Sequence, residues 1–560
     1  MKRFAGLSLL MDLVSALGSG ESSVIDKSTI YKYNLPIMKK QNTHWADSTA
    51  EKITRQKGEK EQYVCASGIT PSGTVHIGNF REIISVELVV RALRDMGKDV
   101  RFIYSWDDYD VFRKVPKNMP QAELLETYLR KPITLVPDTR YSYSSYAEAN
   151  EKELEQILPQ VGVEPEYIYQ AQRYRSAYYA EGIRTALEHR DRIREILDEH
   201  RTTPLPEDWW PVSVFSSFTD RDNTTVLDWD GQWGLTYRCE DTGREETVDL
   251  RDCAVAKLPW RVDWPMRWSH EGVDFEPAGK DHHSEGGSFD TARRLVKEVY
   301  GAEAPVTFQY DFVRIKGRGG KISSSSGEVV GLPEVLEIYQ PEIVRFLFAG
   351  TRPNSEFAIS FDLDVLKIYE DYDKCERIYF GVQEVGEKKR AKESRIYELS
   401  QVHDVPKTMP LQVPFRHLCN LLQIHSGDVD AVLGQYELNR EQKERLGQRA
   451  RCAWNWITRY SPEDFRFHLQ GQDDPRVELD EKQRSVLRAL KVEVEKLVEH
   501  DEESLGTAIY DIARDAEIEP KELFSTVYRI LIGKEKGPRL AGFIFTVGRE
   551  KVLRILERYV

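Results

Sequence analysis

Two short segments, far apart in the chain, contain residue types suited to binding a nucleoside triphosphate. In the first, residues 71–79 (PSGTVHIGN), His76 stands between a strand-like run and a helix-like run that begins at Phe80. The free N–H groups and the dipole at a helix start attract anions, and an imidazole placed there can donate to a phosphate. This segment therefore predicts a site for the α-phosphate of a nucleotide.

The second segment, KISSS from Lys321, follows a β-rich run over residues 306–315 and a glycine-containing loop, 316–320. A lysine on a flexible loop can clamp the far end of a triphosphate. A plain linker is the alternative interpretation of the serine run. Together the two segments predict attack on an α-phosphorus, a reaction in which positioned donors and cations stabilise the developing charge.

Both segments need a scaffold, and residues 62–105 predict one. The order is strand, glycine-containing turn, helix and strand (residues 100–104), which is a βαβ unit with a parallel sheet and a right-handed crossover. Ligands of such sheets bind beyond the carboxyl ends of the strands. His76, Asp107 and Asp108 are all expected to emerge at that edge.

The rest of the chain changes character several times. Residues 145–201 are helix-rich, residues 210–257 alternate short strands with turn residues, and the chain after about residue 335 is mostly helical. The expected fold is α/β: a Rossmann-type parallel-sheet catalytic domain with an inserted small β module, followed by an all-α C-terminal domain. The expected boundaries are an extension at 1–37, catalytic halves at 38–170 and 256–335, an inserted helical and β connective module at 171–255, a connecting segment at 336–390 and a helical domain at 391–560.

Bulk properties limit the class of protein. The chain has 560 residues, of which 40% are hydrophobic and 31% charged, so it can form several well-packed domains. Its net charge of −14 argues against general coating of nucleic acid, although local basic patches can still bind RNA. The six cysteines form no CxxC pair, which favours a reducing cytoplasm.

The first residues resemble the outline of a signal peptide, but Asp12 interrupts a short apolar run. A misplaced start codon or a disordered extension is the favoured interpretation of residues 1–37. No later stretch has about 20 uninterrupted apolar residues, so no membrane partner is expected.

The two segments resemble the HIGH and KMSKS motifs of class I aminoacyl-tRNA synthetases. The surrounding blocks ASGITPSGTVHIGNFRE, LPWRVDWPMRW, GKDHHSEGGS and KGRGGKISSSSG occur in family order and resemble class I lysyl-tRNA synthetases most closely. The resemblance runs from about Met38 to the C-terminus. It implies that ATP with Mg²⁺ activates L-lysine as lysyl-adenylate, that the acyl group passes to the 2′-hydroxyl of the terminal adenosine of tRNA, and that the protein is cytoplasmic and does not bind DNA.

The motifs and this resemblance together predict the site residues. A lysine substrate needs an acidic or aromatic pocket, and interleaved basic and aromatic side chains suit single-stranded RNA. The catalytic candidates are His76, Asn79 and Lys321. The ATP-binding candidates are Pro71, Ser72, Gly73, His76, Gly78, Asn79, Gly279, Asp281, His282, Lys321, Ser323 and Ser324. The amino-acid-binding candidates are Gly68, Thr70, Trp260, Asp263, Trp264 and Tyr310, and the tRNA-binding candidates are Arg449, Trp456 and Arg539.

Several alternatives remain open at this point. Ser324 stands where the second motif of the family usually has a lysine, so either Lys321 acts alone or Lys316 or Arg318 substitutes. The tryptophans of the second block can be core residues. A synthetase for cysteine or glutamate, or a synthetase-like protein that binds tRNA without charging it, are the rival functions.

Metal binding is the weaker interpretation of two features. The side chains of the adjacent residues His282 and His283 diverge, and no suitably spaced ligand accompanies them. The β module contains a lone Cys239 where related proteins often have CxxC pairs, so no structural zinc is expected.

Overall fold

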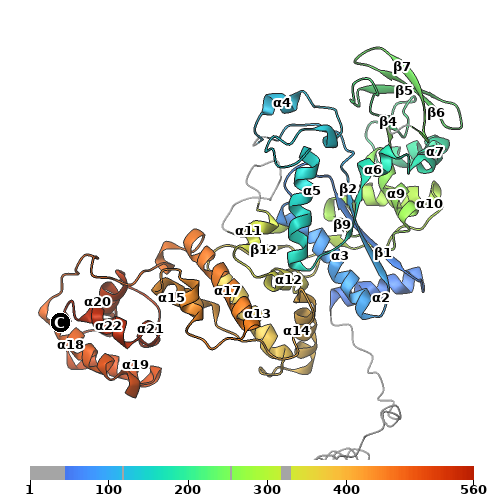
Figure 1. Cartoon of the computed structure of the whole chain (residues 1–560). Coiled ribbons are helices and arrows are strands. Elements are labelled where there is room, and N and C mark those ends of the chain that lie inside the picture. Colours follow the sequence, from blue (N-terminus) through green and yellow to red (C-terminus); the bar gives the residue numbers. More distant parts are fainter. Residues whose placement is uncertain (1–43, 117–118, 253–254, 317–329) are drawn as a thin grey trace, which may run out of the picture. The chain divides into compact units, whose positions relative to one another are not determined.

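The computed structural model describes residues 44–116, 119–252, 255–316 and 330–560. A parallel sheet forms the centre of the N-terminal part (Figure 1). Its strands β1 (Tyr63–Ile69), β2 (Val100–Trp106) and β3 (Glu166–Tyr169) pair in parallel in the order β1-β2-β3. The predicted Rossmann-type sheet is confirmed.

The sheet extends beyond the free edge of β1. Phe275 bridges in parallel to both Cys65 and Val306, and β9 (Ala278–Gly279) pairs in parallel with β10 (Gln309–Tyr310). Segments more than 200 residues apart in sequence therefore lie side by side. Their carboxyl ends reach the same edge of the sheet, where parallel sheets bind ligands.

Helix α3 (Ile77–Asp95) makes the crossover from β1 to β2. It is buried around most of its circumference, because the sheet covers one side and α2 (Trp45–Lys57) and α12 (Pro341–Ala349) pack against it. A buried ion pair of 2.6 Å between Arg345 of α12 and Glu87 of α3 fixes the two helices together. The start of α3 is thus held rigidly at the sheet edge.

The inserted β module is also confirmed. Strands β5 (Thr224–Trp229), β6 (Gly234–Cys239) and β7 (Glu245–Asp249) form an antiparallel sheet. The chain enters and leaves the module through the antiparallel pair β4 (Ser213–Val214) and β8 (Ala256–Lys257). Leu235, Tyr237 and Leu250 of the module belong to a hydrophobic core that also includes Ile183 and Met266 from the helices around it. The exit strand leads directly into the candidate site.

The β-rich run over residues 306–315 differs from the expectation of one strand. It divides into β10 and β11 (Val313–Lys316), and β11 pairs with β12 (Phe357–Ser360) instead of the central sheet. The break comes at Asp311, whose backbone N–H donates to the carbonyl of Pro353 at 2.9 Å. The hydrophobic pattern of the sequence indicates that this run is extended, but it does not indicate that the two halves of the run pair with different strands.

The region after residue 335 is helical, as predicted, and has a hydrophobic core of its own near the C-terminus. Its helices are α13 (Asp364–Tyr379), α14 (Glu387–Ser400), α15 (Phe415–Ile424), α16 (Val429–Leu433), α17 (Arg440–Arg459), α18 (Glu481–Glu495), α19 (Glu502–Asp515), α20 (Pro520–Ile532), α21 (Leu540–Val547) and α22 (Arg549–Leu556). The remaining helices are α4 (Ala122–Glu126), α5 (Tyr146–Ile157), α6 (Gln170–Arg175), α7 (Ala180–Glu188), α8 (Arg190–Asp198), α9 (Trp260–Glu271), α10 (Ser288–Glu298) and α11 (Leu332–Leu336), with single 3₁₀ turns between some of them.

Candidate active site

His76 is the N-cap of α3. Its Nδ1 accepts from the backbone N–H groups of Gly78 at 3.0 Å and Asn79 at 3.3 Å, and the Asn79 side chain accepts from the His76 N–H in return. Burial lowers the pKa of His76, which favours the neutral ring. Because Nδ1 is an acceptor, the proton of the neutral ring resides on Nε2. The imidazole therefore offers one N–H donor at a helix start.

The backbone around His76 is closely fitted. A Cβ atom on Gly78 would lie 2.8 Å from Cε1 of the His76 ring, so glycine is required for this ring position. The preceding loop is held by α5, because Tyr146 donates to the carbonyl of Ser72 at 2.8 Å and Asn150 to that of Pro71 at 3.2 Å. The loop is preorganised by these contacts.

The described residues on either side of the lysine-serine segment show how the chain enters and leaves it. Lys321, Ser323 and Ser324 lie outside the described residues. The chain resumes at Val330, whose carbonyl accepts from Ile77 N–H at 2.9 Å, and Gly331 bridges to His76. The chain that follows the second motif therefore contacts the first motif at the start of α3.

Lys316, a suggested substitute for the missing motif lysine, is already engaged at the other end of that segment. Its ammonium is hydrogen-bonded to Asp364 and lies 3.5 Å from Asp362. The Asp364 carboxylate raises the pKa of Lys316. Lys316 thus anchors the end of β11 to the start of α13.

Helix α9 forms one wall of a cavity at the carboxyl edge of the sheet. Trp260, Trp264 and Trp268 follow each other at intervals of four residues, so they lie on one face of α9 and contact each other edge-on or tilted. The same face carries Arg267 and Glu271. The rest of the lining comes from β1, α3, the end of β2 and residues 273–282 around β9: Ala66, Ser67, Gly68, Glu82, Ile103, Ser105, Asp107, Val273, Glu276, Pro277, Ala278 and His282.

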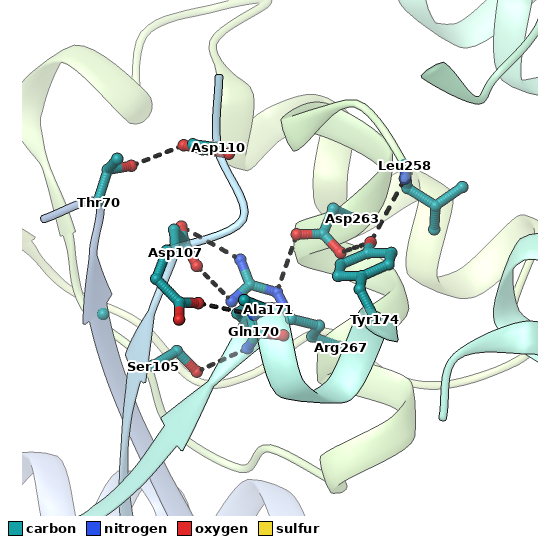
Figure 2. Close-up of polar contacts among 12 residues, drawn as sticks. Thr70, Ser105, Asp107, Asp110, Gln170, Ala171, Tyr174, Leu258, Asp263 and Arg267 are labelled. Atoms are coloured by element: carbon teal, nitrogen blue, oxygen red, sulfur yellow. Dashed lines mark hydrogen bonds and ion pairs between the residues drawn. The ribbon is translucent and has the colours of Figure 1, made fainter. Parts of the chain in front are cut away.

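Two of the carboxylates in this cavity have cationic partners. Asp107 accepts from Arg267 Nη1 at 2.7 Å, and Glu271 lies 2.8 Å from Arg101 (Figure 2 shows the first pair). Arg267 also lies 3.2 Å from Asp263 on the side away from the cavity. These pairs neutralise one part of the wall.

The other two carboxylates are held by uncharged donors. Glu82 accepts from the Tyr310 hydroxyl at 2.5 Å and from the Ser67 hydroxyl at 2.7 Å. Glu276 accepts from the indole N–H of Trp268 at 2.5 Å. Burial raises the pKa of Glu82, and it raises the pKa of Glu276 to about 7. An ammonium group entering the cavity would relieve this desolvation by pairing with them.

Most predicted amino-acid contacts lie at this cavity, but two do not. Gly68, Trp260 and Trp264 line it, and Tyr310 reaches it through Glu82. Asp263 instead pairs with Arg267 and accepts from the Tyr174 hydroxyl, so it supports the wall from behind (Figure 2). Thr70 lies at a neighbouring cavity, where its hydroxyl donates to Asp110 at 2.8 Å.

The predicted ribose-side residues follow β9. Gly279 ends that strand, a 3₁₀ turn begins with Lys280, and Asp281 is exposed on it. His282 turns toward the tryptophan wall, where its Nδ1 lies 2.5 Å from the Ser288 hydroxyl. Gly73 is half-buried in the loop before His76, and a Cβ atom there would meet only the Tyr146 hydroxyl, at 3.8 Å.

Glu82, Arg267 and Glu276 were not assigned to the site from the sequence, whereas Asp107 was expected at this edge of the sheet but was given no role. Glu82 had a signal: it is three positions after Asn79, so the two side chains lie on the same side of α3. Arg267 and Glu271 have the same helical spacing as the tryptophans, so helical periodicity alone places them on the same face of α9. Glu276 had no comparable local signal, because it reaches the cavity only through the pairing of its segment with the edge of the sheet.

The predicted tRNA contacts fall into two groups. Arg449 and Trp456 are buried in α17, where Arg449 forms a bidentate pair with Asp373 at 2.6 and 3.0 Å and Trp456 donates to the carbonyl of Phe361 at 3.0 Å. Both are core residues, so the expectation that they bind tRNA is corrected. Arg539 is exposed at the start of α21, beside Lys534 and Lys536.

The described ranges also bear on metal binding and on membrane insertion. Among those residues, no group of three or more His, Cys, Asp or Glu side chains is arranged to hold a metal ion. Cys239 is buried beside Thr219, and the cysteines in this part of the chain form no disulfide. No helix within the described ranges combines the length and apolar character needed to cross a membrane.

Comparison with known proteins agrees with this geometry. The family model described as tRNA synthetases class I (K) matches residues 43–403, and an anticodon binding domain matches residues 460–560. A protein named lysine–tRNA ligase from Borreliella burgdorferi is 54% identical over 519 residues, which cover 92% of this chain and 99% of that protein. Proteins of the same name from Treponema pallidum and Pyrococcus horikoshii are 53% and 44% identical, with 92% of this chain and 98% and 99% of those proteins covered. The chain belongs to the class I (K) tRNA synthetases.

Proposed function

We propose that this protein attaches L-lysine to its cognate tRNA in an ATP-dependent reaction with a lysyl-adenylate intermediate. The observation that carries the proposal is the pair Glu82 and Glu276, two carboxylates held by neutral donors in a cavity walled by tryptophans. An ε-ammonium group supplies the charge that these carboxylates lack, and its aliphatic stem fits against indole rings.

The same cavity argues against the rival amino acids. The carboxylate of glutamate would face Glu82 and Glu276 and be repelled. Cysteine carries no positive charge and would leave both groups desolvated and unpaired, which is costly in a buried site. The cavity therefore favours lysine, and the names of the relatives point the same way.

The start of α3 supports an ATP site next to this cavity. The N–H donor on His76 Nε2 and the helix dipole would face the α-phosphate, and Asn79 would hold the imidazole in place. Gly279, Asp281 and His282 would face the nucleoside, with Asp281 accepting from ribose hydroxyls. Lys321, Ser323 and Ser324 would face the β- and γ-phosphates, and Mg²⁺ would enter with ATP, because this ion usually binds through substrate phosphates.

The carboxylate oxygen of lysine would then attack the α-phosphorus and pyrophosphate would leave. The acyl group would pass to the 2′-hydroxyl of the terminal adenosine. The anticodon-domain match and the exposed Arg539 support recognition of the tRNA by the C-terminal helical region. The domain limits that we propose are those expected from the sequence, with the tRNA-binding helical domain at residues 391–560.

The test is aminoacylation of total tRNA with each of the twenty amino acids, together with pyrophosphate exchange in the presence and absence of tRNA. Charging with lysine alone is the expected result. Charging with another amino acid would contradict the assignment of the cavity but keep the class I chemistry. ATP binding without charging or exchange would favour the rival protein that binds tRNA without acylating it.

A further inference from the structure

A groove between α5 and α6 contains two buried carboxyl groups that have none of the roles described above. Its volume is about 780 Å³, within the usual range of ligand sites. We call it the α5–α6 groove. Asp108, which follows β2, lines it together with Glu148 and Glu151 of α5, Tyr169 of β3 and Arg175 of α6. The groove therefore combines three carboxyl groups with an aromatic ring.

Glu151 is the residue that points to a ligand. It is only 4% exposed, and its Oε1 atom has no hydrogen-bond partner among the residues that the structure describes. A buried acceptor in this state costs free energy, which a donor that reached it would recover. Because Glu151 lines the groove, a ligand in the groove can bring that donor.

Asp108 brings a second carboxyl group to the same place. It is also 4% exposed, and its Oδ1 accepts from the Ala171 N–H group at 2.7 Å, which fixes it at the start of α6. Burial raises the pKa of Asp108 to about 7. Burial and then the charge of Asp108 raise the pKa of Glu151 to about 8. The other charged groups around the pair are Asp107, Glu148, Lys152, Glu155 and Arg175.

The two cations at the groove are engaged with other partners. The Lys152 ammonium lies 2.5 Å from the Glu155 carboxylate and donates to the Tyr169 hydroxyl at 2.9 Å. Arg175 donates to the Thr134 hydroxyl at 2.9 Å. Within the described ranges neither cation forms an ion pair with the two buried carboxyl groups. The positive charge that these groups lack therefore has to come from a ligand.

The spacing of the carboxyl groups indicates what kind of cation fits. Glu148 and Glu151 are three residues apart in α5, so they lie on one face of the helix with their Cβ atoms about 5–6 Å apart. Ammonium groups joined by a few methylene groups match this spacing, and the methylene groups can pack against the Tyr169 ring. A metal ion fits less well, because no three potential ligand side chains in the described part of the chain are arranged to hold one.

We propose that the α5–α6 groove binds a linear polyamine, with one ammonium group between Asp108 and Glu151 and a second at Glu148. The site does not depend on the proposed function. Helix α5 also holds the loop before α3, because Asn150 donates to the Pro71 carbonyl at 3.2 Å. A bound polyamine therefore ties the helix that supports this loop to the end of β2.

The test is isothermal titration of spermidine into the full-length protein at pH 7 and about 0.15 M salt, with saturating L-lysine present. The lysine occupies the cavity walled by α9, and the salt screens exposed carboxylates. One spermidine should bind per chain and release protons, because its ammonium groups favour the ionised forms of carboxyl groups with pKa values of about 7 and about 8. Titrations in phosphate and in MOPS, which differ in ionisation enthalpy, measure this release.

Glu151→Gln is expected to weaken spermidine binding at least about tenfold, the size of one hydrogen bond to a charged group. It should also remove most of the proton release. Glu153→Gln makes the same change on α5 outside the groove and is the matched control, with unchanged affinity. Asp108→Asn keeps an acceptor for the Ala171 N–H group and tests the same site if Glu151→Gln does not fold.

Absence of binding to the wild type would overturn the inference, as would an affinity that Glu151→Gln and Asp108→Asn both leave unchanged. Binding without proton release would place the polyamine on exposed carboxylates, and binding that L-lysine abolishes would place it in the cavity walled by α9. Either result overturns the inference.

A titration with L-lysine alone distinguishes the source of the ammonium group. One lysine per chain is expected. A second lysine that is lost in Glu151→Gln would show that the groove binds an amino acid, which also overturns the inference. None of these measurements depends on charging, so failure of the proposed function is seen separately, as the absence of lysine charging by the wild type.

Discussion

Helices α9 and α17 carry similar residue types but use them in opposite ways. Each presents tryptophan and arginine at helical spacing, and both were predicted to contact substrates. On α9, Trp260 and Trp264 line a cavity. On α17, Arg449 and Trp456 are buried among neighbouring helices, and Arg449 lies over the Tyr369 ring, 4.8 Å from its centre.

The difference lies in the partners supplied by other elements. Asp373 of α13 neutralises the Arg449 charge with two hydrogen bonds, so that pair forms a closed structural contact. The α9 cavity holds Glu82 and Glu276, which have neutral donors but no cation among the contacts of the described residues. Charge that remains uncompensated in a cavity indicates a binding site, whereas charge compensated inside the protein indicates structure.

The largest expected effect is a loss of stability when the structural pair of Arg449 and Asp373 is broken. Arg449→Ala leaves the Asp373 carboxylate buried without its partner, which costs about 3–5 kcal/mol of the free energy of unfolding. Chemical denaturation monitored by circular dichroism measures this loss. The affinity of folded Arg449→Ala for tRNA is expected to be unchanged.

The double variant Arg449→Met/Asp373→Asn is the control for that prediction. Replacing both charges removes the unpaired carboxylate, so most of the lost stability should return. If Arg449→Ala were as stable as the wild type and bound tRNA weakly, Arg449 would be a tRNA contact after all.

The next largest expected effect is on the binding of lysine in the α9 cavity. Glu82→Gln keeps the shape of the side chain but removes its charge and replaces one of its two acceptor oxygens with an amide N–H group, from which a hydroxyl oxygen can accept. The value of kcat/KM for lysine should therefore fall about 100-fold, the size expected for loss of a buried charge pair. Steady-state aminoacylation at varied lysine concentration measures it. The unfolding midpoint should not fall, because burial already disfavours the ionised form of Glu82.

Asp373→Asn is the matched charge removal outside the cavity. It should lower stability but leave the KM for lysine unchanged. An equal effect of both substitutions on the KM for lysine would show that the cavity has no special role in recognising lysine.

The parts of the site that sequence could predict are those formed by contiguous residues. The turn from β1 to α3 places His76, Gly78 and Asn79 by local geometry alone, and the predicted N-terminal placement of His76 is what the structure has. The β module and the C-terminal helices follow from strand alternation and helical periodicity. These features depend on neighbours in sequence.

The parts that could not be predicted depend on distant pairings. Glu276 enters the cavity because residues 274–279 add to the sheet beside β1, more than 200 residues away in sequence. The burial of Arg449 requires Asp373 on another helix, and a helix sequence does not state which of its faces a partner will cover. One sequence without coordinates contains no direct signal for either contact.

The smallest expected effect is a dependence of the lysine affinity of the cavity on pH. Burial raises the pKa of Glu276 to about 7, so this carboxyl is largely protonated at pH 6 and largely ionised at pH 8. The lysine ε-ammonium stays charged throughout this range. The affinity for lysine should therefore rise about tenfold from pH 6 to pH 8, as expected for one ionisation with a pKa near 7. The raised pKa of Glu82 acts in the same direction.

Isothermal titration of lysine into the enzyme at several pH values measures this dependence, and Glu276→Gln should flatten it. The two histidines nearest to the site do not produce the same trend, because burial lowers the pKa values of His76 and His282 and keeps both rings neutral over most of this range. A wild-type affinity that is flat, or that rises toward pH 6, would mean that Glu276 does not face the ammonium. Lysine would then be recognised by Glu82 and the indole rings without it.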